Sequence, residues 1–213
     1  MKIAIIGAGN VGGALGKAWA ERAGHEVFFG VRQPASEKTK TLLAGIHGKA
    51  RAGSPQQAAA FADVIVLTTP WPETENAIRV MGDLKGKIIL DCTNPLGMVD
   101  GGLGLTIGHS TSGGEKVQGW AADALVFKTL NTTGFSNMAD ASYKAGKPVM
   151  FVAGDDAVAK PKVMALVGEL GFDMVDAGPL RNARLLEAHA MLWIDLALNR
   201  GFGPDWAFAI VRR

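Results

Sequence analysis

Residues 2 to 32 read KIAIIGAGNVGGALGKAWAERAGHEVFFGVR, and this stretch decides the fold. Its first apolar run, residues 3–6, predicts a short buried strand. The pattern G-x-G-x-x-G follows at once, and a helix is expected from there to residue 23, before Gly24 at the position of a glycine cap. Residues 25–30 then predict a second strand. The stretch therefore predicts a strand–helix–strand unit with a glycine loop after its first strand.

The three glycines of this loop meet different requirements. Gly7 permits a tight turn, Gly9 lets the backbone approach a pyrophosphate, and Gly12 lets the helix pack close to the strand. The start of the helix adds free N–H groups and the positive end of its dipole, both of which favour a phosphate. We therefore expect a dinucleotide to bind along the loop. Its residues are Gly7, Ala8, Gly9, Asn10, Val11 and Gly12.

The end of the second predicted strand indicates which dinucleotide binds. An acidic residue there accepts hydrogen bonds from the ribose 2′-hydroxyl of NAD, whereas an arginine accommodates the 2′-phosphate of NADP. This chain has Val31 and Arg32 at that position and no carboxylate, and Lys38 follows on the next predicted helix. The arginine offers a planar fork of donors that suits a phosphate. The alternative is that Arg32 is only a solvated residue at a strand end, but the pattern favours NADP.

The rest of the chain continues the alternation of strands and helices. Strands are predicted at residues 49–51, 64–68, 87–91, 124–129, 147–153 and 172–176, and helices at 34–46, from 54 onward, at 73–81 and at 155–170. The run of residues 64–68 is continuously apolar or β-branched, as buried parallel strands are. The predicted fold class is α/β, with a doubly wound, mostly parallel Rossmann sheet of eight strands and a C-terminal helical segment.

Polar loops follow several of these strands. Ligands of doubly wound sheets bind at the carboxyl ends of the strands, so these loops should converge with the glycine loop. The candidate cofactor-binding residues are Thr68, Thr69, Pro70 and Trp71 after one strand, Asn94, Pro95 and Leu96 after the next, and Asn131 and Thr132 after a third. We expect all of them at one edge of the sheet.

The long glycine-rich stretch 97–114 has no regular apolar pattern. A loop of this length inside a compact domain is usually functional or mobile, so a lid over the site is one interpretation. Its end, Ser110-Thr111-Ser112 before Gly113 and Glu115, is equally well explained as the start of a helix.

From residue 179 onward the pattern changes. Residues 182–199 predict a helix that is apolar around most of its circumference and so must be buried. It packs either on its own chain or partly against a second subunit, and we expect a homodimer. Accordingly, residues 1–178 are predicted to form the NADP-binding domain and 179–213 a segment packed on it or on the partner subunit. His189, with Glu187 and Asp195 nearby, is expected to be a satisfied interface histidine.

Composition excludes several other classes of protein. The chain has 213 residues, 48% of them hydrophobic, and a net charge of +2, which gives no sign of a nucleic-acid surface. The sequence begins directly with a predicted strand, so we expect no signal peptide, and it lacks an apolar run long enough to cross a bilayer. Cys92 is the only cysteine, which fits a core residue in a reducing cytoplasm. The four histidines show no metal-binding spacing.

No catalytic side chain is predicted. Hydride transfer between two bound redox cofactors requires proximity and alignment, because no alkoxide develops that needs a proton donor. A dehydrogenase of alcohols would instead need a Tyr, Lys or His near the nicotinamide. Tyr143, the only tyrosine, stands directly beside Lys144 rather than one helical turn from it, so this pair carries little weight.

Several segments together resemble one family. They are IGAGNVG at 6–12, GHEV at 24–27 running to GVR at 30–32, LTTPW at 67–71, GDD at 154–156 and, most diagnostic, DAGPLRNARLLE at 176–187. The chain is similar to NADPH-dependent coenzyme F420 reductases, also called F420-dependent NADP oxidoreductases, whose fold is shared by the oxidoreductase domain of STEAP metalloreductases. The resemblance covers almost the whole chain.

The resemblance implies roles for the candidate residues. Ala8 to Val11 would hold the pyrophosphate, and Val31 and Arg32 the 2′-phosphate. Residues 69–71 and 94–96 would hold the nicotinamide half, and residues 131–135 would border the second redox partner. That partner would be F420 or a flavin, FMN or FAD. Two other functions stay open: an NADP(H) sensor without turnover, and an NADPH-dependent reductase of a small imine or carbonyl compound.

Overall fold

The computed structural model describes residues 1–211 and 213. Its main sheet consists of β1 (Lys2–Ile6), β2 (Glu26–Gly30), β3 (Ala50–Gly53), β4 (Val64–Leu67), β5 (Ile88–Asp91), β8 (Leu125–Thr129), β9 (Val149–Gly154) and β10 (Asp173–Asp176). The helices are α1 (Asn10–Glu21), α2 (Glu37–Ala44), α3 (Pro55–Phe61), α4 (Trp71–Arg79), α5 (Gly113–Trp120), α6 (Phe135–Ala139), α7 (Lys160–Gly168) and α8 (Ala183–Asn199), with a 3₁₀ turn at Leu180–Asn182.

The strand order of the main sheet is β10-β9-β8-β5-β4-β1-β2-β3. All neighbouring strands are parallel except β8 and β9. The predicted eight-stranded, mostly parallel α/β sheet is therefore confirmed. The chain leaves β1 toward β2 and β3 on one side and returns to β4 and β5 on the other, so the topological switch point lies between β1 and β4.

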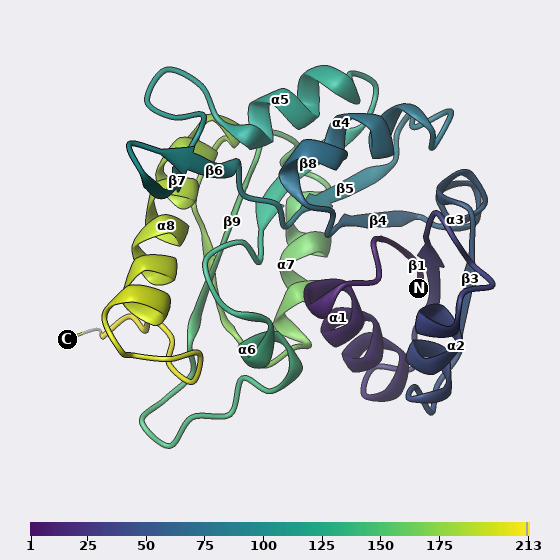
Figure 1. Cartoon of the computed structure of the whole chain (residues 1–213), viewed down its shortest axis with the longest axis horizontal. Coiled ribbons are helices and arrows are strands. Elements are labelled where there is room, and N and C mark those ends of the chain that lie inside the picture. The colour runs from purple at the N-terminus through teal and green to yellow at the C-terminus, as the bar shows by residue number, and fades with distance from the viewer. Residues whose placement is uncertain (212) are drawn as a thin grey trace.

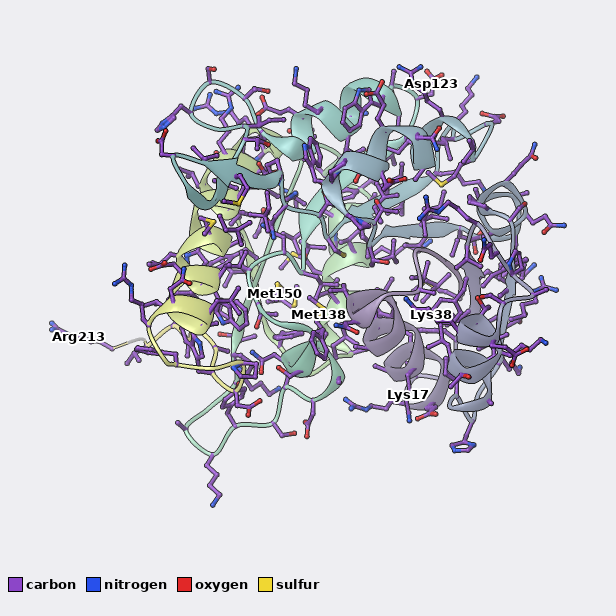
Figure 2. All side chains as sticks on the ribbon, in the orientation of Figure 1. Lys17, Lys38, Asp123, Met138, Met150 and Arg213 are labelled. Carbon is purple, nitrogen blue, oxygen red and sulfur yellow. The ribbon has the colours of Figure 1, made fainter. Side chains whose placement is uncertain are left out.

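Helices cover both faces of the sheet (Figure 1), with α4 and α5 above it in that view and α1 and α6 below. Successive strand residues alternate between two cores, as the pleat requires. Ile3 and Ile5 of β1 pack with α1 and α7, whereas Ala4 and Ile6 pack with α3 and α4. Figure 2 shows two residues of the first core, Met138 and Met150, toward the middle of the molecule.

Three helix starts differ from the sequence predictions, one of them α2, which begins at Glu37 rather than 34 and has Ser36 as its cap. Helix α4 begins at Trp71 rather than 73, because Pro72 is tolerated in a first turn, where no intrahelical N–H bond is lost. Helix α7 begins at Lys160 rather than 155. Asp156 precedes it and accepts hydrogen bonds from the N–H groups of Val158 and Ala159, while Asp155 accepts one from Leu180 after β10.

The stretch 97–114 is not simply a loop. It contains an antiparallel ribbon of β6 (Leu96–Val99) and β7 (Gly102–Leu105), which lies beside α8 in Figure 1. Asp100 and Gly101 form its two-residue turn with φ of 48° and 82°. Positive φ at both positions is what a type I′ hairpin turn requires, and Asp-Gly is a favoured pair there. The expected helix start after it is confirmed, since the Ser112 hydroxyl accepts a hydrogen bond from the Glu115 N–H.

Helix α8 is buried along one side only. Leu186, Ala190 and Trp193 are buried, whereas Leu185 is 67% exposed and Leu198 is 71% exposed. The tail after α8 folds back, and the Phe208 carbonyl accepts a hydrogen bond from the Val149 N–H at 2.9 Å. Among the described residues, no helix is both long and apolar enough to cross a membrane.

The sequence predicts that His189 is a satisfied interface histidine, and the prediction that its ring is satisfied is wrong. Its ring packs between Phe151 and Phe208, with ring centroids 5.6 and 4.2 Å away, and its buried Nε2 has no hydrogen-bond partner within the described part of the chain. Asp195 instead bonds to Asn199 and Arg200. Burial lowers the pKa of His189 below its ordinary value, which favours the neutral ring.

Candidate functional site

The glycine loop has the geometry that a dinucleotide requires. Gly7 has φ of 111°, a conformation that residues with a Cβ rarely adopt. A Cβ on Gly12 would lie 2.3 Å from the Gly7 carbonyl oxygen, so this position excludes any larger residue. A Cβ on Gly9 would meet nothing within 4 Å, and Gly9 precedes α1 without a side-chain cap on the helix. The open space and the uncapped N–H groups suit a phosphate.

Thr68 fastens the end of β4 to this loop. Its hydroxyl lies 3.1 Å from the Ile6 carbonyl oxygen and 3.3 Å from that of Gly7, both of which it can donate to. Thr69 precedes α4, and its hydroxyl lies 2.9 Å from that of Thr74 within the helix. The half-buried Trp71 begins α4 and packs on Trp120 at 5.4 Å between ring centroids. The structure therefore brings Thr68 beside the glycine loop, and residues 69–71 follow it into the first turn of α4.

Arg32 stands at the end of β2 with its side chain 82% exposed. Its Nη1 lies 3.3 Å from Oε2 of Glu73, in the first turn of α4. Because β1 lies between β2 and β4, this ion pair crosses the carboxyl end of β1, where the glycine loop begins. Lys38, on α2, is also exposed and is labelled in Figure 2. The sequence prediction missed Glu73, because no local pattern connects it with Arg32.

The loops after β5 and β8 are joined by two asparagines. The Asn94 amide donates to the Asn131 carbonyl oxygen at 2.9 Å, and the Asn131 amide donates to Oδ1 of Asn94 at 3.0 Å and to the Leu186 carbonyl oxygen at 3.2 Å. Asn131 is 5% exposed, and its Oδ1 has no partner among the residues described. The preceding residue, Leu130, is fully buried with φ of 59°. A non-glycine residue in this region stores strain, which often occurs beside functional sites.

Other predicted residues of these loops face the protein. Thr132 is 4% exposed, and its hydroxyl lies 3.7 Å from the Met150 sulfur. Pro95 is buried, and its carbonyl oxygen accepts hydrogen bonds from the N–H and the hydroxyl of Thr106. Leu96 begins β6. The β6–β7 ribbon is thus attached at its base to the loop after β5.

Behind these loops lies a buried charge cluster that the sequence prediction missed. We call Lys128, Asp91 and Glu187 the lysine cluster; the three side chains are at most 1% exposed. Burial alone would lower the pKa of Lys128, but the two carboxylates outweigh it and hold that pKa above its ordinary value. Burial, with a contribution from Asp91, raises the pKa of the Cys92 thiol, which fits its predicted role as a core residue. Charged residues within the apolar runs ILD and VFK are the signal that could have revealed the cluster.

This fold, with its glycine loop at the switch point, defines a dinucleotide-binding protein of the Rossmann class. Residues 2–95 match the family described as NADP oxidoreductase, coenzyme F420-dependent. A proposed F420-dependent NADP-reductase from Arthrobacter sp. FB24 is 33% identical over the whole of both chains, with a TM-score of 0.90. The chain therefore belongs to the family of F420-dependent NADP oxidoreductases.

Two other similarities extend less far. A hypothetical protein from Sinorhizobium meliloti is 26% identical, with a TM-score of 0.73 over 86% of this chain and 88% of that one. A reductive aminase from Aspergillus terreus, solved with NADPH, is 19% identical with a TM-score of 0.69. That similarity shows the fold alone. It covers 94% of this chain but only 63% of the aminase, so the aminase contains a large part that has no counterpart here.

Proposed function

We propose that this protein transfers a hydride directly between NADP(H) and the deazaflavin coenzyme F420. The observation that carries the proposal is the open backbone cradle at Gly9, adjoining an exposed arginine at the end of β2, in a chain of this family. The absence of a carboxylate directly after β2 favours a 2′-phosphate over a free 2′-hydroxyl.

In this proposal the backbone from Ala8 to Val11 holds the pyrophosphate, and Arg32 with Val31 and Lys38 holds the 2′-phosphate. Residues 69–71 and 94–96 position the nicotinamide half, and residues 131–135 border the acceptor. Bound NADPH supplies the hydride. The chain's contribution is alignment and exclusion of water, since the step needs no side-chain acid or base. The reciprocally bonded Asn94 and Asn131, half-buried and buried respectively, support this role, because they hold two loops in one arrangement.

The alternatives differ in the acceptor. A flavin, FMN or FAD, could accept the same hydride, and a sensor would bind NADP(H) without turnover. Reduction of a small imine or carbonyl compound is less well supported. The imine reductase from Bacillus cereus shares the fold at 18% identity, but the match covers only 59% of that chain.

We further propose a cytoplasmic homodimer. The exposed Leu185 and Leu192, seven residues apart and so on one side of α8, support a second subunit on that side of the helix. In this arrangement residues 1–178 form the NADP-binding domain, and residues 179–213 contribute to both the domain and the interface. Light scattering on the purified protein tests the dimer, and Leu185→Glu with Leu192→Glu should then yield a monomer.

Anaerobic stopped-flow absorbance tests the reaction. The protein is mixed with NADPH and either oxidised F420 or FMN. Rapid bleaching of the F420 band supports the proposed reaction, while bleaching of FMN alone would replace F420 by a flavin. Binding of NADPH without reduction of either acceptor would favour the sensor.

A further inference from the structure

The lysine cluster lies outside the proposed cofactor contacts. The ammonium group of Lys128, on β8, lies 2.9 Å from Oδ2 of Asp91, 2.9 Å from Oε1 of Glu187 and 2.6 Å from the carbonyl oxygen of Thr93. An ammonium group has three donors, so each has an acceptor. A buried lysine with this geometry is fixed in one position, and so are the groups that it binds.

The two carboxylates extend this arrangement to the backbone. Oδ1 of Asp91 accepts hydrogen bonds from the N–H of Thr93 at 2.9 Å and from its hydroxyl at 2.7 Å. The carboxylate of Glu187, on α8, accepts hydrogen bonds from the N–H groups of Gly113 and Gly114 at the start of α5, at 2.8 and 3.0 Å. The cluster thus links β5, β8, α5 and α8 at one point.

The segments held in this way adjoin the proposed nicotinamide contacts. Thr93, bonded through its N–H, hydroxyl and carbonyl groups, directly precedes Asn94. A Cβ on Gly113 would lie 3.2 Å from the ring of Trp71 and 3.3 Å from Cδ of Pro95, and so these two side chains pack against the start of α5. Movement of the cluster would therefore displace the side chains of Trp71 and Pro95.

We propose that Lys128, together with Asp91 and Glu187, acts as a positioning residue for the nicotinamide half of the cofactor, by fixing residues 93–95 and the α5 segment against Trp71. The inference rests on the proposed NADP site. Stability alone is a weak reason for such a cluster, because well-packed apolar side chains often replace buried ion pairs without loss. A fixed loop geometry, in contrast, requires the charged cluster, because apolar side chains cannot form hydrogen bonds with the Thr93 backbone.

The test compares two ligands. NADPH occupies the whole proposed site, whereas adenosine 2′,5′-bisphosphate contains the 2′-phosphate but lacks the nicotinamide. Dissociation constants for both are measured by calorimetry on the wild type, on Lys128→Met and on Thr93→Val, which removes only the hydroxyl bond to Asp91. The matched control is Lys160→Met. Its ammonium group, 12% exposed at the side-chain level, similarly binds Asp176 and the Gly178 carbonyl oxygen, but at the far edge of the sheet.

We expect Thr93→Val to weaken NADPH binding by about threefold to tenfold, the size of one hydrogen bond, with less than about a twofold change for the bisphosphate. Lys128→Met should have the larger effect on NADPH, and Lys160→Met should change neither ligand. Equal losses for both ligands, or no loss in either variant, would overturn the positioning role. If Lys128→Met does not fold, Thr93→Val decides alone. A wild type that binds neither ligand would instead remove the proposed NADP site and this inference with it.

Discussion

Two regions of the proposed site are built in different ways. The glycine-loop region, residues 7–12 with Arg32, is open at Gly9 and presents the uncapped start of α1 and the exposed Arg32 side chain. The paired-asparagine region, Asn94 and Asn131 with the lysine cluster behind them, is buried except for the half-buried Asn94, and its side chains bind one another. The first region offers groups to a ligand, whereas the second holds its surroundings in place.

The difference concerns distance along the chain. The glycine-loop region arises from one strand–helix–strand unit, residues 2–32, to which Thr68 and Glu73 add contacts from β4 and α4. In the paired-asparagine region, Asn94 and Asn131 are 37 residues apart, and Glu187 is 74 residues from Gly113. Substitutions should therefore affect ligand contacts in the first region and loop geometry in the second.

The largest effect is expected from the glycines. Gly9→Ala places a methyl group in the space that a phosphate would occupy, so the NADPH dissociation constant should rise by about a hundredfold while stability changes by less than about 1 kcal/mol. Gly12→Ala, which clashes with the Gly7 carbonyl, should lose binding and also about 1–3 kcal/mol of stability. Calorimetric titration measures the NADPH dissociation constants of both variants, and urea unfolding measures their stability. Wild-type affinity in Gly9→Ala would contradict the phosphate assignment.

The next largest effect concerns the preference of the site for NADP over NAD. Arg32→Ala removes a charge-assisted contact with the 2′-phosphate, so the NADPH dissociation constant should rise by about tenfold to a hundredfold, roughly 1.5–3 kcal/mol. NADH lacks this phosphate and should bind almost unchanged. Titrations with both cofactors provide the measurement, and equal losses for both would show that Arg32 does not contact the 2′-phosphate.

Substitution of Glu73 should have the opposite effect on NADPH binding from substitution of Arg32. Its carboxylate occupies one donor of Arg32 and adds a negative charge near the expected phosphate. Glu73→Gln should therefore tighten NADPH binding by about twofold to fivefold at low salt, the size of an exposed ion pair, and less at high salt. NADH serves as the internal control. Weaker NADPH binding in this variant would mean that Glu73 supports the cofactor instead.

The smallest effect concerns His189, on the helix that supports the paired-asparagine region. Burial lowers the pKa of His189 in the folded state, so below about pH 6.5 the unfolded chain binds more protons at this residue. Stability should therefore decrease as the pH falls from 6.5 toward 5. The thermal midpoint of His189→Phe should show less of this decrease, whereas the exposed His47→Gln control should keep it. The same pH dependence in all three proteins would exclude His189 as its source.

The sequence by itself determined the fold class, the glycine loop and the position of Arg32. These depend on local spacing: a strand, three glycines at fixed intervals and the end of the next strand. The hairpin of β6 and β7 also has a local signal in the sequence, because Asp100-Gly101 is a favoured turn pair.

Only the tertiary structure decided how these parts meet. The Arg32–Glu73 pair, the two bonded asparagines and the lysine cluster each join residues that are tens of positions apart. A lysine within an apolar strand indicates a buried charge, but its partners depend on which strands are neighbours and which helix packs beside them. Buried charges need partners wherever the fold supplies them, and that requirement leaves no regular spacing in the sequence.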